Sequence, residues 1–339
     1  MGLGQNGKGG EAMRRLLLTG GMGFIGSHLV EGVLKNTDWE IIILDRLDTS
    51  GNPNRLTDME IWNKEKHRVK FIWWDLKSEL NDFVKSEIGE VGYIWHVAAS
   101  SHVDRSIENP MMFVMDNVVG TCNILNFART IKNLKLFVNF STDEVFGPVR
   151  EGLSNEYDHH HPKNPYAATK SAQEALGESF ENCYKLPLIT THTMNVIGER
   201  QHPEKFIPST IRKILNGETV IIHANPEKTR AASRFYIHAR NVCDALLFLT
   251  EKGFNGYDEF NIVGEQEIDA LSLAQKIAKI IGMELKYEMV DFHSSRPGHD
   301  LRYALDGSKM AKLGWKPPKT FDESLERTVK WYLRHKEWL

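Results

Sequence analysis

The strongest constraint on the fold is a glycine-rich stretch between an apolar run and a helical pattern. TGGMGFIG occupies residues 19–26, directly after the apolar run 15–19 and at the start of the helical pattern 24–35. The glycines that fit the spacings G-x-G-x-x-G and G-x-x-G-x-x-G are Gly20, Gly21, Gly23 and Gly26. Glycine permits a tight turn and lets backbone N–H groups approach a pyrophosphate at a helix N-terminus. With a strand before it and a helix after it, the stretch predicts a dinucleotide site.

Short apolar runs alternate with longer helical patterns through the first half of the chain. The runs that we interpret as buried strands are 15–19, 40–44, 69–73, 93–97, 135–140 and 188–193. The clearest helical patterns are 24–35, 110–130 and 165–184. This alternation predicts right-handed βαβ units, and hence an α/β fold with a doubly wound, Rossmann-type parallel sheet.

The rhythm changes after about Gly198, where Pro and charged residues become frequent. We therefore end a dinucleotide-binding domain, which contains the catalytic residues, at residue 197. This domain begins at residue 13, after a predicted disordered leader over 1–12. Residues 198–339 would form a smaller, mostly C-terminal substrate-binding lobe, interleaved with the last elements of the sheet.

Composition limits the possible partners and compartments. The chain has 42 Lys and Arg against 45 Asp and Glu, a balance that gives no sign of nucleic-acid or membrane-surface binding. Its three cysteines are widely spaced, which favours a reducing cytoplasm over a disulfide framework or a zinc site. No apolar run reaches the roughly 20 residues of a membrane helix. His159, His160 and His161 are consecutive, so we interpret them as a solvated loop and predict no metal.

An acidic residue at the end of the second predicted strand indicates which dinucleotide binds. Asp45 lies where a carboxylate would accept hydrogen bonds from the adenosine ribose and repel a 2′-phosphate, which favours NAD over NADP. Arg46 follows it directly and could accommodate a phosphate, so the alternative stays open. Asp75, Ala98 and Ala99 follow the next strands, where the adenine and ribose would pass.

YAATK (166–170) places a tyrosine and a lysine on one helix face. Tyr166 and Lys170 are four residues apart. A nearby ammonium favours the phenolate and thus a base that works at neutral pH. The cofactor-binding residues that we predict are Gly20, Gly23, Phe24, Ile25, Gly26, Asp45, Asp75, Leu76, Ala98, Ala99, Tyr166 and Lys170.

NFSTDEVFG (139–147) follows a predicted buried strand and carries two adjacent acids. Asp143 and Glu144 would point to opposite faces of a strand, so a shared role requires a turn beyond the strand end. Ser-Thr-Asp-Glu is equally typical of a helix start. The stretch alone leaves both interpretations open.

Together these motifs resemble the extended short-chain dehydrogenase/reductase superfamily, and within it the dTDP-glucose 4,6-dehydratases. The resemblance rests on stretches in that family's order, which cover the chain beyond the leader: HVAASSHVDRSIENP (96–110), DNVVGT (116–121), STDEVFG (141–147), NPYAATKSAQE (164–174), HPEKFIP (202–208) and RPGHDLRYALDGSK (296–309). It implies conversion of dTDP-glucose to dTDP-4-keto-6-deoxyglucose and water, through internal hydride transfer by bound NAD.

The resemblance also implies roles for individual residues. Tyr166 would take the C4 hydroxyl proton, with Lys170 orienting the nicotinamide ribose and Thr142 bonding the C4 oxygen. Glu144 would remove the C5 proton and Asp143 would protonate the leaving C6 hydroxyl. The implied substrate-binding residues are Ser101, Asn195, Lys205, Arg234 and Arg296.

The chain departs from the family pattern at four positions. The family usually has Glu at Ser100, Tyr at Phe146, Trp at Tyr236 and Asp at Asn241. By the resemblance, the segment 233–241 helps to form the nucleotide pocket, so thymine and uracil both stay open as the base.

Other enzymes on the same scaffold are the main alternatives. They are a dehydratase of UDP-glucose or another nucleotide sugar, a nucleotide-sugar 4-epimerase and a UDP-glucuronate decarboxylase, with a non-catalytic NAD sensor as a different class. The pair Asp143 and Glu144 weighs against an epimerase, which needs no acid and base at C5 and C6. By the same resemblance, the helices 110–130 and 165–184 would pair with those of a second subunit in a four-helix bundle, giving a homodimer.

Overall fold

The structure, a computed structural model, describes residues 14–149, 151–291 and 302–339. The predicted leader lies outside these residues. The chain divides into two compact units that interleave along the sequence. The first contains Met1–Thr142, Pro165–His192 and Leu246–Phe260, and the second contains Asp143–Asn164, Thr193–Ala245 and Asn261–Leu339. The predicted domain limits at 197 and 198 stay a prediction.

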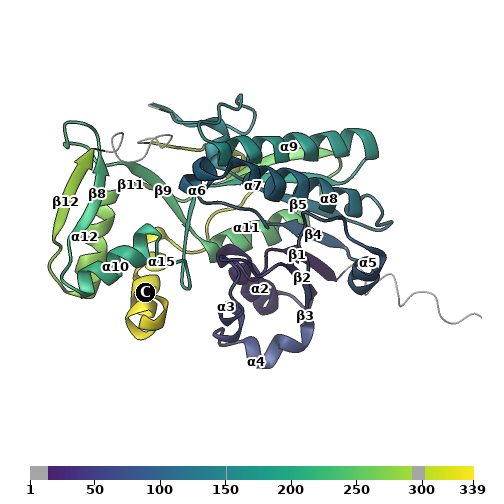
Figure 1. The fold of residues 1–339 in the computed structure, drawn as a ribbon, viewed down its shortest axis with the longest axis horizontal. Coiled ribbons are helices and arrows are strands. Elements are labelled where there is room, and N and C mark those ends of the chain that lie inside the picture. The colour runs from purple at the N-terminus through teal and green to yellow at the C-terminus, as the bar shows by residue number, and fades with distance from the viewer. Residues whose placement is uncertain (1–13, 150, 292–301) are drawn as a thin grey trace, which may run out of the picture. The chain divides into compact units, whose positions relative to one another are not determined.

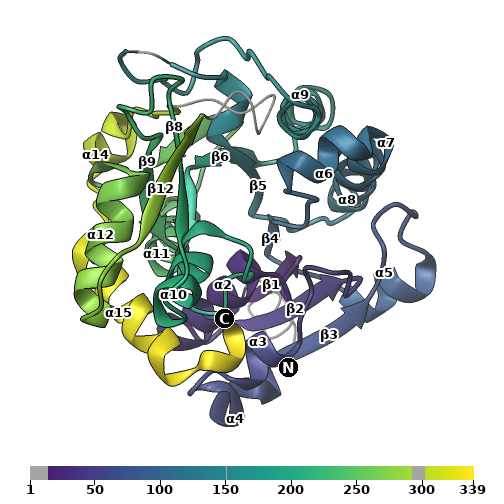
Figure 2. The same cartoon turned by 60° about the vertical axis from the view of Figure 1, so that its left-hand side comes forward.

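A seven-stranded sheet forms the centre of the first unit. Its strands are β1 (Arg15–Thr19), β2 (Glu40–Asp45), β3 (Val69–Trp73), β4 (Tyr93–His96), β5 (Leu136–Thr142), β6 (Leu188–Thr193) and β10 (Tyr257–Ile262). Their order in space is β10-β6-β5-β4-β1-β2-β3, and the pairs from β5 to β3 run parallel (Figure 2). The reversal of strand order beside β1 is the hallmark of a doubly wound sheet. The predicted Rossmann-type fold is confirmed.

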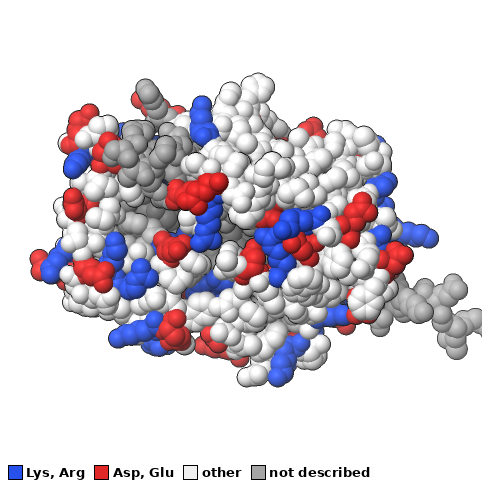
Figure 3. Space-filling view, viewed as in Figure 1, with Lys and Arg blue, Asp and Glu red and all other residues white. Residues whose placement is uncertain are grey.

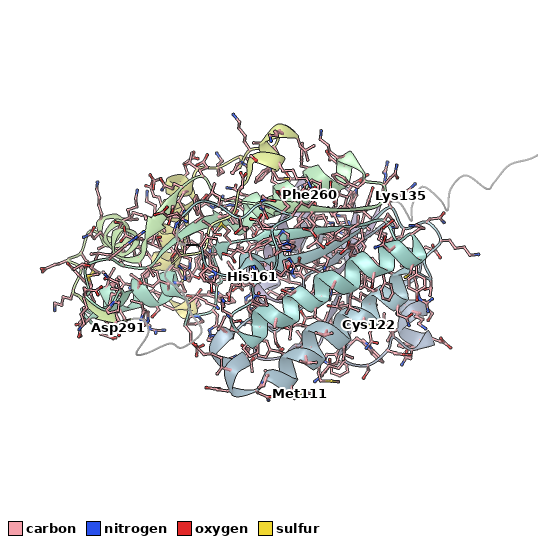
Figure 4. The ribbon with its side chains drawn as sticks, turned by 90° about the horizontal axis from the view of Figure 1, so that it is seen from above. Met111, Cys122, Lys135, His161, Phe260 and Asp291 are labelled. Carbon is pink, nitrogen blue, oxygen red and sulfur yellow. The ribbon has the colours of Figure 1, made fainter. Side chains whose placement is uncertain are left out.

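The first unit also contains helices between the strands of this sheet. They are α2 (Phe24–Asn36), α3 (Asn54–Thr57), α4 (Trp62–Glu65), η1 (Lys66–Arg68), α5 (Asp82–Ile88), α6 (Val103–Glu108), α7 (Pro110–Phe113), η2 (Val114–Val119), α8 (Gly120–Ala128) and α9 (Pro165–Tyr184), while α11 (Ala239–Lys252) crosses the unit boundary. The run from α7 to α8 lies alongside α9 (Figures 1 and 4). The predicted single helix over 110–130 is therefore α7 and α8 joined by the π-helical turn η2.

One predicted strand differs from expectation in its burial. The run 69–73 does form β3, but β3 is the edge strand of the sheet and pairs only with β2. Phe71 and Trp73 are 40% and 60% exposed, so β3 is not a buried strand. An edge strand has a neighbour on one side only, which leaves its aromatic side chains partly in solvent.

The second unit contains two small sheets and its own core. Its strands are β7 (Asn195–Ile197), β8 (Val220–Ala224), β9 (Ser233–His238), β11 (Glu267–Asp269) and β12 (Tyr287–Asp291). They form a sheet of order β11-β9-β7 and a parallel pair of β8 and β12. The helices are η3 (Asp143–Phe146), α10 (Phe206–Leu215), α12 (Ala270–Ile281), α14 (Ser308–Lys312), α15 (Phe321–Arg334) and η4 (Lys336–Trp338). Apolar side chains of α10, α12 and α15, including Ile211, Ile277 and Val329, bury one another.

The surface carries charges of both signs. Acidic and basic side chains are interspersed over the face shown in Figure 3, whereas the area over α7, α8 and α9 shows few of them. None of the helices in the described ranges combines the length and the apolar character that a bilayer span requires.

Candidate active site

The glycine stretch forms a tight turn between β1 and α2. Gly20 has a φ of +75°, which L side chains rarely adopt, and a Cβ there would lie 2.9 Å from the Ala98 backbone. A Cβ at Gly26 would overlap the carbonyl oxygen of Gly20. The N-cap of α2 is Gly23, which has no side chain to accept a hydrogen bond from the first-turn N–H groups. This cradle fits the pyrophosphate of a dinucleotide.

Asp45 ends β2 with its carboxylate held in place by backbone amides. Its two oxygens accept hydrogen bonds from Met22 N–H at 2.9 Å and from Leu47 N–H at 2.8 Å. Burial raises the pKa of Asp45, although these two bonds act in the opposite direction. A carboxylate has about four acceptor positions, which leaves capacity for ribose hydroxyls.

The other predicted cofactor residues follow strand ends of the first unit. Phe24 and Ile25 are half-buried in the first turn of α2, and Asp75 and Leu76 come after β3. Asp75 caps the next turn by accepting a hydrogen bond from Lys77 N–H, while Leu76 belongs to the apolar core. Ala98 and Ala99 follow β4 and are half-buried. The carboxyl ends of parallel strands share one edge of the sheet, where doubly wound folds bind ligands.

Tyr166 and Lys170 lie on α9 and are both buried. The Lys170 ammonium donates hydrogen bonds of 2.6 Å to the Phe140 carbonyl on β5 and to Gln173 Oε1. Tyr166 packs edge-on against Phe113, and its backbone N–H donates to Ser106 Oγ at 3.2 Å. Both predicted residues are therefore held by other residues of the first unit, and Lys170 contacts β5 near its carboxyl end.

The electrostatics of Lys170 suit proton chemistry near neutrality. Burial lowers the pKa of Lys170 to about 7, while the nearby Glu174 carboxylate acts to raise it. Glu174 itself accepts hydrogen bonds from Ser141 Oγ and His192, so it is fixed within the same buried layer between β5, β6 and α9.

The stretch with the two acids turns from strand to helix without a loop. β5 extends through Ser141 to Thr142, two residues further than predicted, and the 3₁₀ helix η3 begins at Asp143. Asp143 is buried and Glu144 is half-buried, with Glu144 Oε2 accepting a hydrogen bond from Asn164 Nδ2 at 2.8 Å. The two acids thus form the start of a short helix, as the helix-start interpretation predicted. They also lie past the strand end, as a shared catalytic role requires.

The predicted substrate-binding residues are distributed over both units. Ser101 is exposed after β4 in the first unit. In the second unit, Asn195 begins β7 and pairs with Tyr236 on β9, the strand that also carries Arg234. The Arg234 guanidinium lies 4.9 Å from the ring centroid of Tyr303, and Lys205 directly precedes α10. Arg296 lies outside the described residues.

Three of the departures from the family pattern lie in the second unit. Phe146 is buried in an apolar cluster with Val145, Met194 and Leu305. Tyr236 is half-buried, and the removal of its hydroxyl from solvent raises its pKa to about 12. Asn241 is buried in the first turn of α11 and donates a hydrogen bond to the Lys319 carbonyl at 2.7 Å.

The structure also reveals functional candidates that the sequence prediction missed, all in the π turn η2. Asn117 is buried and accepts a hydrogen bond from Ser100 N–H at 2.8 Å. Its amide donates to the Ser100 carbonyl at 3.0 Å and to Thr169 Oγ1 at 2.9 Å. Its neighbour Asp116 binds Arg46 and Ser100. The sequence feature that could have indicated these candidates is the adjacent polar pair Asp116 and Asn117 within an apolar helical pattern.

Comparisons with known proteins identify the family of this chain. The profile of the family described as GDP-mannose 4,6 dehydratase matches residues 17–328. The chain is 36% identical to the low-salt glycan biosynthesis protein Agl12 of Haloferax volcanii, over 94% of this chain and 98% of that protein. It is 35% identical to a dTDP-glucose 4,6-dehydratase of Escherichia coli, over 96% and 95% of the two chains. It is 33% identical to the trifunctional UDP-glucose 4,6-dehydratase/UDP-4-keto-6-deoxy-D-glucose 3,5-epimerase/UDP-4-keto-L-rhamnose-reductase RHM1 of Arabidopsis thaliana, over 96% of this chain and 48% of that protein.

A solved structure extends the likeness to the fold. The crystal structure of DesIV, a dTDP-glucose 4,6-dehydratase from Streptomyces venezuelae with NAD and TYD bound, matches with a TM-score of 0.85. The two chains are 33% identical, over 96% of this chain and 98% of that one. The resemblance drawn from the sequence motifs is thereby confirmed, and the chain belongs to the GDP-mannose 4,6 dehydratase family of nucleotide-sugar 4,6-dehydratases.

Proposed function

We propose that this protein is an NAD-dependent 4,6-dehydratase that converts dTDP-glucose to dTDP-4-keto-6-deoxyglucose and water. The observation that carries the proposal is the junction at the end of β5. Thr142, Asp143 and Glu144 follow one another there, and the buried Lys170 of the Tyr166–Lys170 pair holds the carbonyl of Phe140, two residues before Thr142. The continuity of the chain from Thr142 to Glu144 supports the assignment of oxidation and elimination to these groups.

NAD is the cofactor that the residues of the first unit fit. The glycine turn is so tight that a Cβ at Gly20 or Gly26 would overlap the protein backbone, as in the glycine turns that let backbone approach a pyrophosphate, and Asp45 offers a carboxylate to ribose hydroxyls. The NAD in the DesIV structure supports the same assignment. When bound, its nicotinamide would supply the hydride chemistry by accepting a hydride from C4 of the sugar and returning it to C6.

Oxidation at C4 needs a base for the hydroxyl proton. Tyr166 would take this proton as the phenolate, which the adjacent Lys170 ammonium favours. The Thr142 hydroxyl would hydrogen-bond the C4 oxygen and orient it. Lys170, anchored on Phe140 and Gln173, would also orient the nicotinamide ribose.

Elimination needs a base at C5 and an acid at C6. Once C4 is a ketone, the C5 proton is acidic because the resulting carbanion is an enolate. Glu144 would accept this proton, and Asp143 would donate a proton to the C6 hydroxyl, which leaves as water. The proton on Glu144 would then return to C5 as C6 receives the hydride. Two carboxyl groups in different environments can divide such roles, and here Asp143 is buried while Glu144 is half-buried.

Substrate recognition is proposed for residues of both units. Arg234 and Arg296 would bind the diphosphate, since planar guanidinium donors match phosphate oxygens. Ser101, Asn195 and Lys205 would contact the rest of the nucleotide sugar. The relatives include dehydratases of dTDP-glucose and of UDP-glucose, so the choice of base needs its own test.

Incubation with dTDP-glucose and UDP-glucose in parallel tests the function. We expect loss of one water from dTDP-glucose without added NAD, detected by product mass, and slower loss from UDP-glucose. The Tyr166→Phe variant should lose turnover by roughly 10²- to 10⁴-fold, the usual contribution of a general base.

Other outcomes would identify the alternatives. Faster dehydration of UDP-glucose than of dTDP-glucose would show that UDP-glucose is the preferred substrate of the same dehydration reaction. A product of unchanged mass with inverted configuration at C4 would indicate an epimerase. Loss of carbon dioxide from UDP-glucuronate would indicate a decarboxylase. Retained dinucleotide with no turnover of any sugar nucleotide would indicate a sensor.

We also propose that two copies of the chain pair through α7, η2, α8 and α9. Met111 on α7 is 64% exposed, and Val114 and Met115 on η2 are also exposed. The few charged side chains over these helices in Figure 3 and the position of Met111 in Figure 4 support burial in a four-helix bundle.

Light scattering after size-exclusion chromatography tests the homodimer. The expected mass is twice 38.8 kDa. The double variant Met111→Glu with Met115→Glu should shift it to one chain. Phe83→Glu is the matched control, because Phe83 is also exposed but lies on α5. A monomeric parent protein would contradict the proposal.

A further inference from the structure

Arg46 directly follows Asp45, and its guanidinium is fully occupied by carboxylates. Both of its terminal nitrogens donate to Asp116, at 2.6 and 2.8 Å. Nε and one terminal nitrogen donate to Asp48, at 3.1 and 2.8 Å, and the other terminal nitrogen lies 3.4 Å from Asp75. These five contacts match the five N–H donors of a guanidinium.

Asp116 is the buried partner in this arrangement. It belongs to η2, where the π-helical turn brings Asp116 and Asn117 toward the segment after β4. Ser100 Oγ donates a hydrogen bond of 2.6 Å to Asp116 Oδ2, at the position where the family pattern usually has Glu. In this chain, a carboxylate is thus present beside residue 100 but comes from η2.

The Asp116 carboxylate stays ionised at neutral pH. Burial acts to raise the pKa of Asp116, but hydrogen bonds from Arg46 and Ser100 outweigh it and leave the pKa below its ordinary value. The hydrogen bonds to Asp116 are the largest cause that raises the pKa of Arg46, and those to Asp48 act in the same direction. The pair is therefore a permanent, bidentate ion pair with one buried member.

An arginine in this place has a chemical consequence for dinucleotide choice. NADP differs from NAD by a phosphate on the adenosine ribose, at the group that an acid at the end of the second strand contacts. A nearby Arg can accommodate that phosphate. Here the arginine beside Asp45 would have to break its bonds to Asp116 and Asp48 before it could do so.

We propose that Asp116 is a specificity-determining residue, which sets the preference for NAD over NADP by withholding the Arg46 guanidinium from a 2′-phosphate. The inference rests on the proposed binding of a dinucleotide at the glycine turn. It assigns the discrimination against NADP to two groups: Asp45, which repels the phosphate, and Asp116, which removes the cation that would attract it.

Equilibrium binding of NAD and NADP to the protein stripped of nucleotide tests the proposal without any turnover. We would measure both dissociation constants by calorimetry for the parent and for Asp116→Asn. The substitution should raise the affinity for NADP relative to NAD by about tenfold, equivalent to about 1.4 kcal/mol. Asp48→Asn, which removes the more exposed partner, should shift the ratio less and provides a second variant if Asp116→Asn folds poorly.

Two further variants separate this role from a general electrostatic or structural one. Adding Arg46→Gln to Asp116→Asn should abolish the gain for NADP, as a double-mutant cycle requires of a coupled pair. Asp38→Asn removes one negative charge from an exposed ion pair with Arg14 and should leave the ratio unchanged.

The outcomes are distinct. An equal loss of affinity for both dinucleotides in Asp116→Asn would overturn the inference and leave Asp116 as a structural brace. So would a gain for NADP that survives Arg46→Gln or occurs in Asp38→Asn. A parent protein that binds neither dinucleotide would overturn the proposed function as well, whereas normal NAD binding with an unchanged ratio in Asp116→Asn would overturn the inference alone.

Discussion

The Lys170 ammonium donates a 2.6 Å hydrogen bond to the Phe140 carbonyl, which ties α9 to the end of β5 where the catalytic candidates begin. The bond places a positive charge in a buried layer that also contains Gln173 and Glu174. Because burial lowers the pKa of Lys170 to about 7, this contact links the geometry of the site to the pH dependence of stability.

Replacement of Lys170 by methionine should reveal that link in the protein freed of NAD. Folded Lys170 loses its proton near pH 7, whereas the unfolded chain keeps it up to about 10.5. The unfolded state therefore binds more protons between these values, and the parent gains stability relative to Lys170→Met as the pH rises, by up to about 1.4 kcal/mol per pH unit. Chemical denaturation across this range measures the difference. Lys64→Met, on a side chain that is 83% exposed, is the control, and a flat difference for Lys170→Met would refute the prediction.

The acids after β5 should separate oxidation from elimination. Glu144→Gln and Asp143→Asn each keep the size of the side chain but remove the base or the acid. We expect dehydration to fall by roughly 10²- to 10⁴-fold while reduced nicotinamide still forms on the enzyme. Product mass and the ultraviolet absorbance of the bound nicotinamide report the two steps. Glu227→Gln, at an exposed turn of the second unit, should behave as the parent, and full dehydration by Glu144→Gln would exclude the assigned base.

Alanine at Gly26 should damage the dinucleotide turn specifically. Its Cβ would overlap the Gly20 carbonyl oxygen, so the turn would have to open. We expect a loss of NAD affinity of tenfold or more, equivalent to about 1.4 kcal/mol or more, with a lower melting temperature. Gly120→Ala is the matched control, since its Cβ would meet Leu76 at an ordinary 3.4 Å. Unchanged NAD binding in Gly26→Ala would show that the turn is not the cofactor site.

Removal of the Asn117 side chain should destabilise the first unit. The change to alanine would leave the Ser100 backbone and Thr169 without three hydrogen-bond contacts, two of them partly buried and one buried. A loss of about 2–4 kcal/mol in the free energy of unfolding is expected, since unsatisfied buried polar groups each cost about 1–3 kcal/mol. Urea denaturation measures it. Asn36→Ala, at an exposed position near the end of α2, should change stability by less than about 0.5 kcal/mol. Equal effects of the two changes would argue against the role of Asn117.

Sequence patterns predicted several strands closely because those strands are short apolar runs between turn residues. β1, β3 and β6 match the predicted runs residue for residue, and α9 matches its predicted helix. The end of β5 was missed because Ser141 and Thr142 are polar. Both residues are buried, and the Ser141 hydroxyl donates to Glu174 of α9, a tertiary effect that hydrophobic periodicity does not register.

The π turn in the run 110–130 could not be read from local pattern either. Its polar residues Asp116 and Asn117 find partners 16 to 70 positions away in the chain, at Ser100, Thr169 and Arg46. A helix that satisfies such partners is free to depart from regular α geometry. The exposure of β3 likewise depends on its place at the edge of the sheet rather than on its own composition.

The sequence by itself determined the glycine turn, the acid that ends β2, the Tyr166–Lys170 spacing and the order of strands and helices. Each of these is set by residues close together in the chain. The tertiary structure alone decided that Lys170 is buried against Phe140 and that Arg46 is held by Asp116. Burial and charge pairing depend on groups that only the folded sheet brings together.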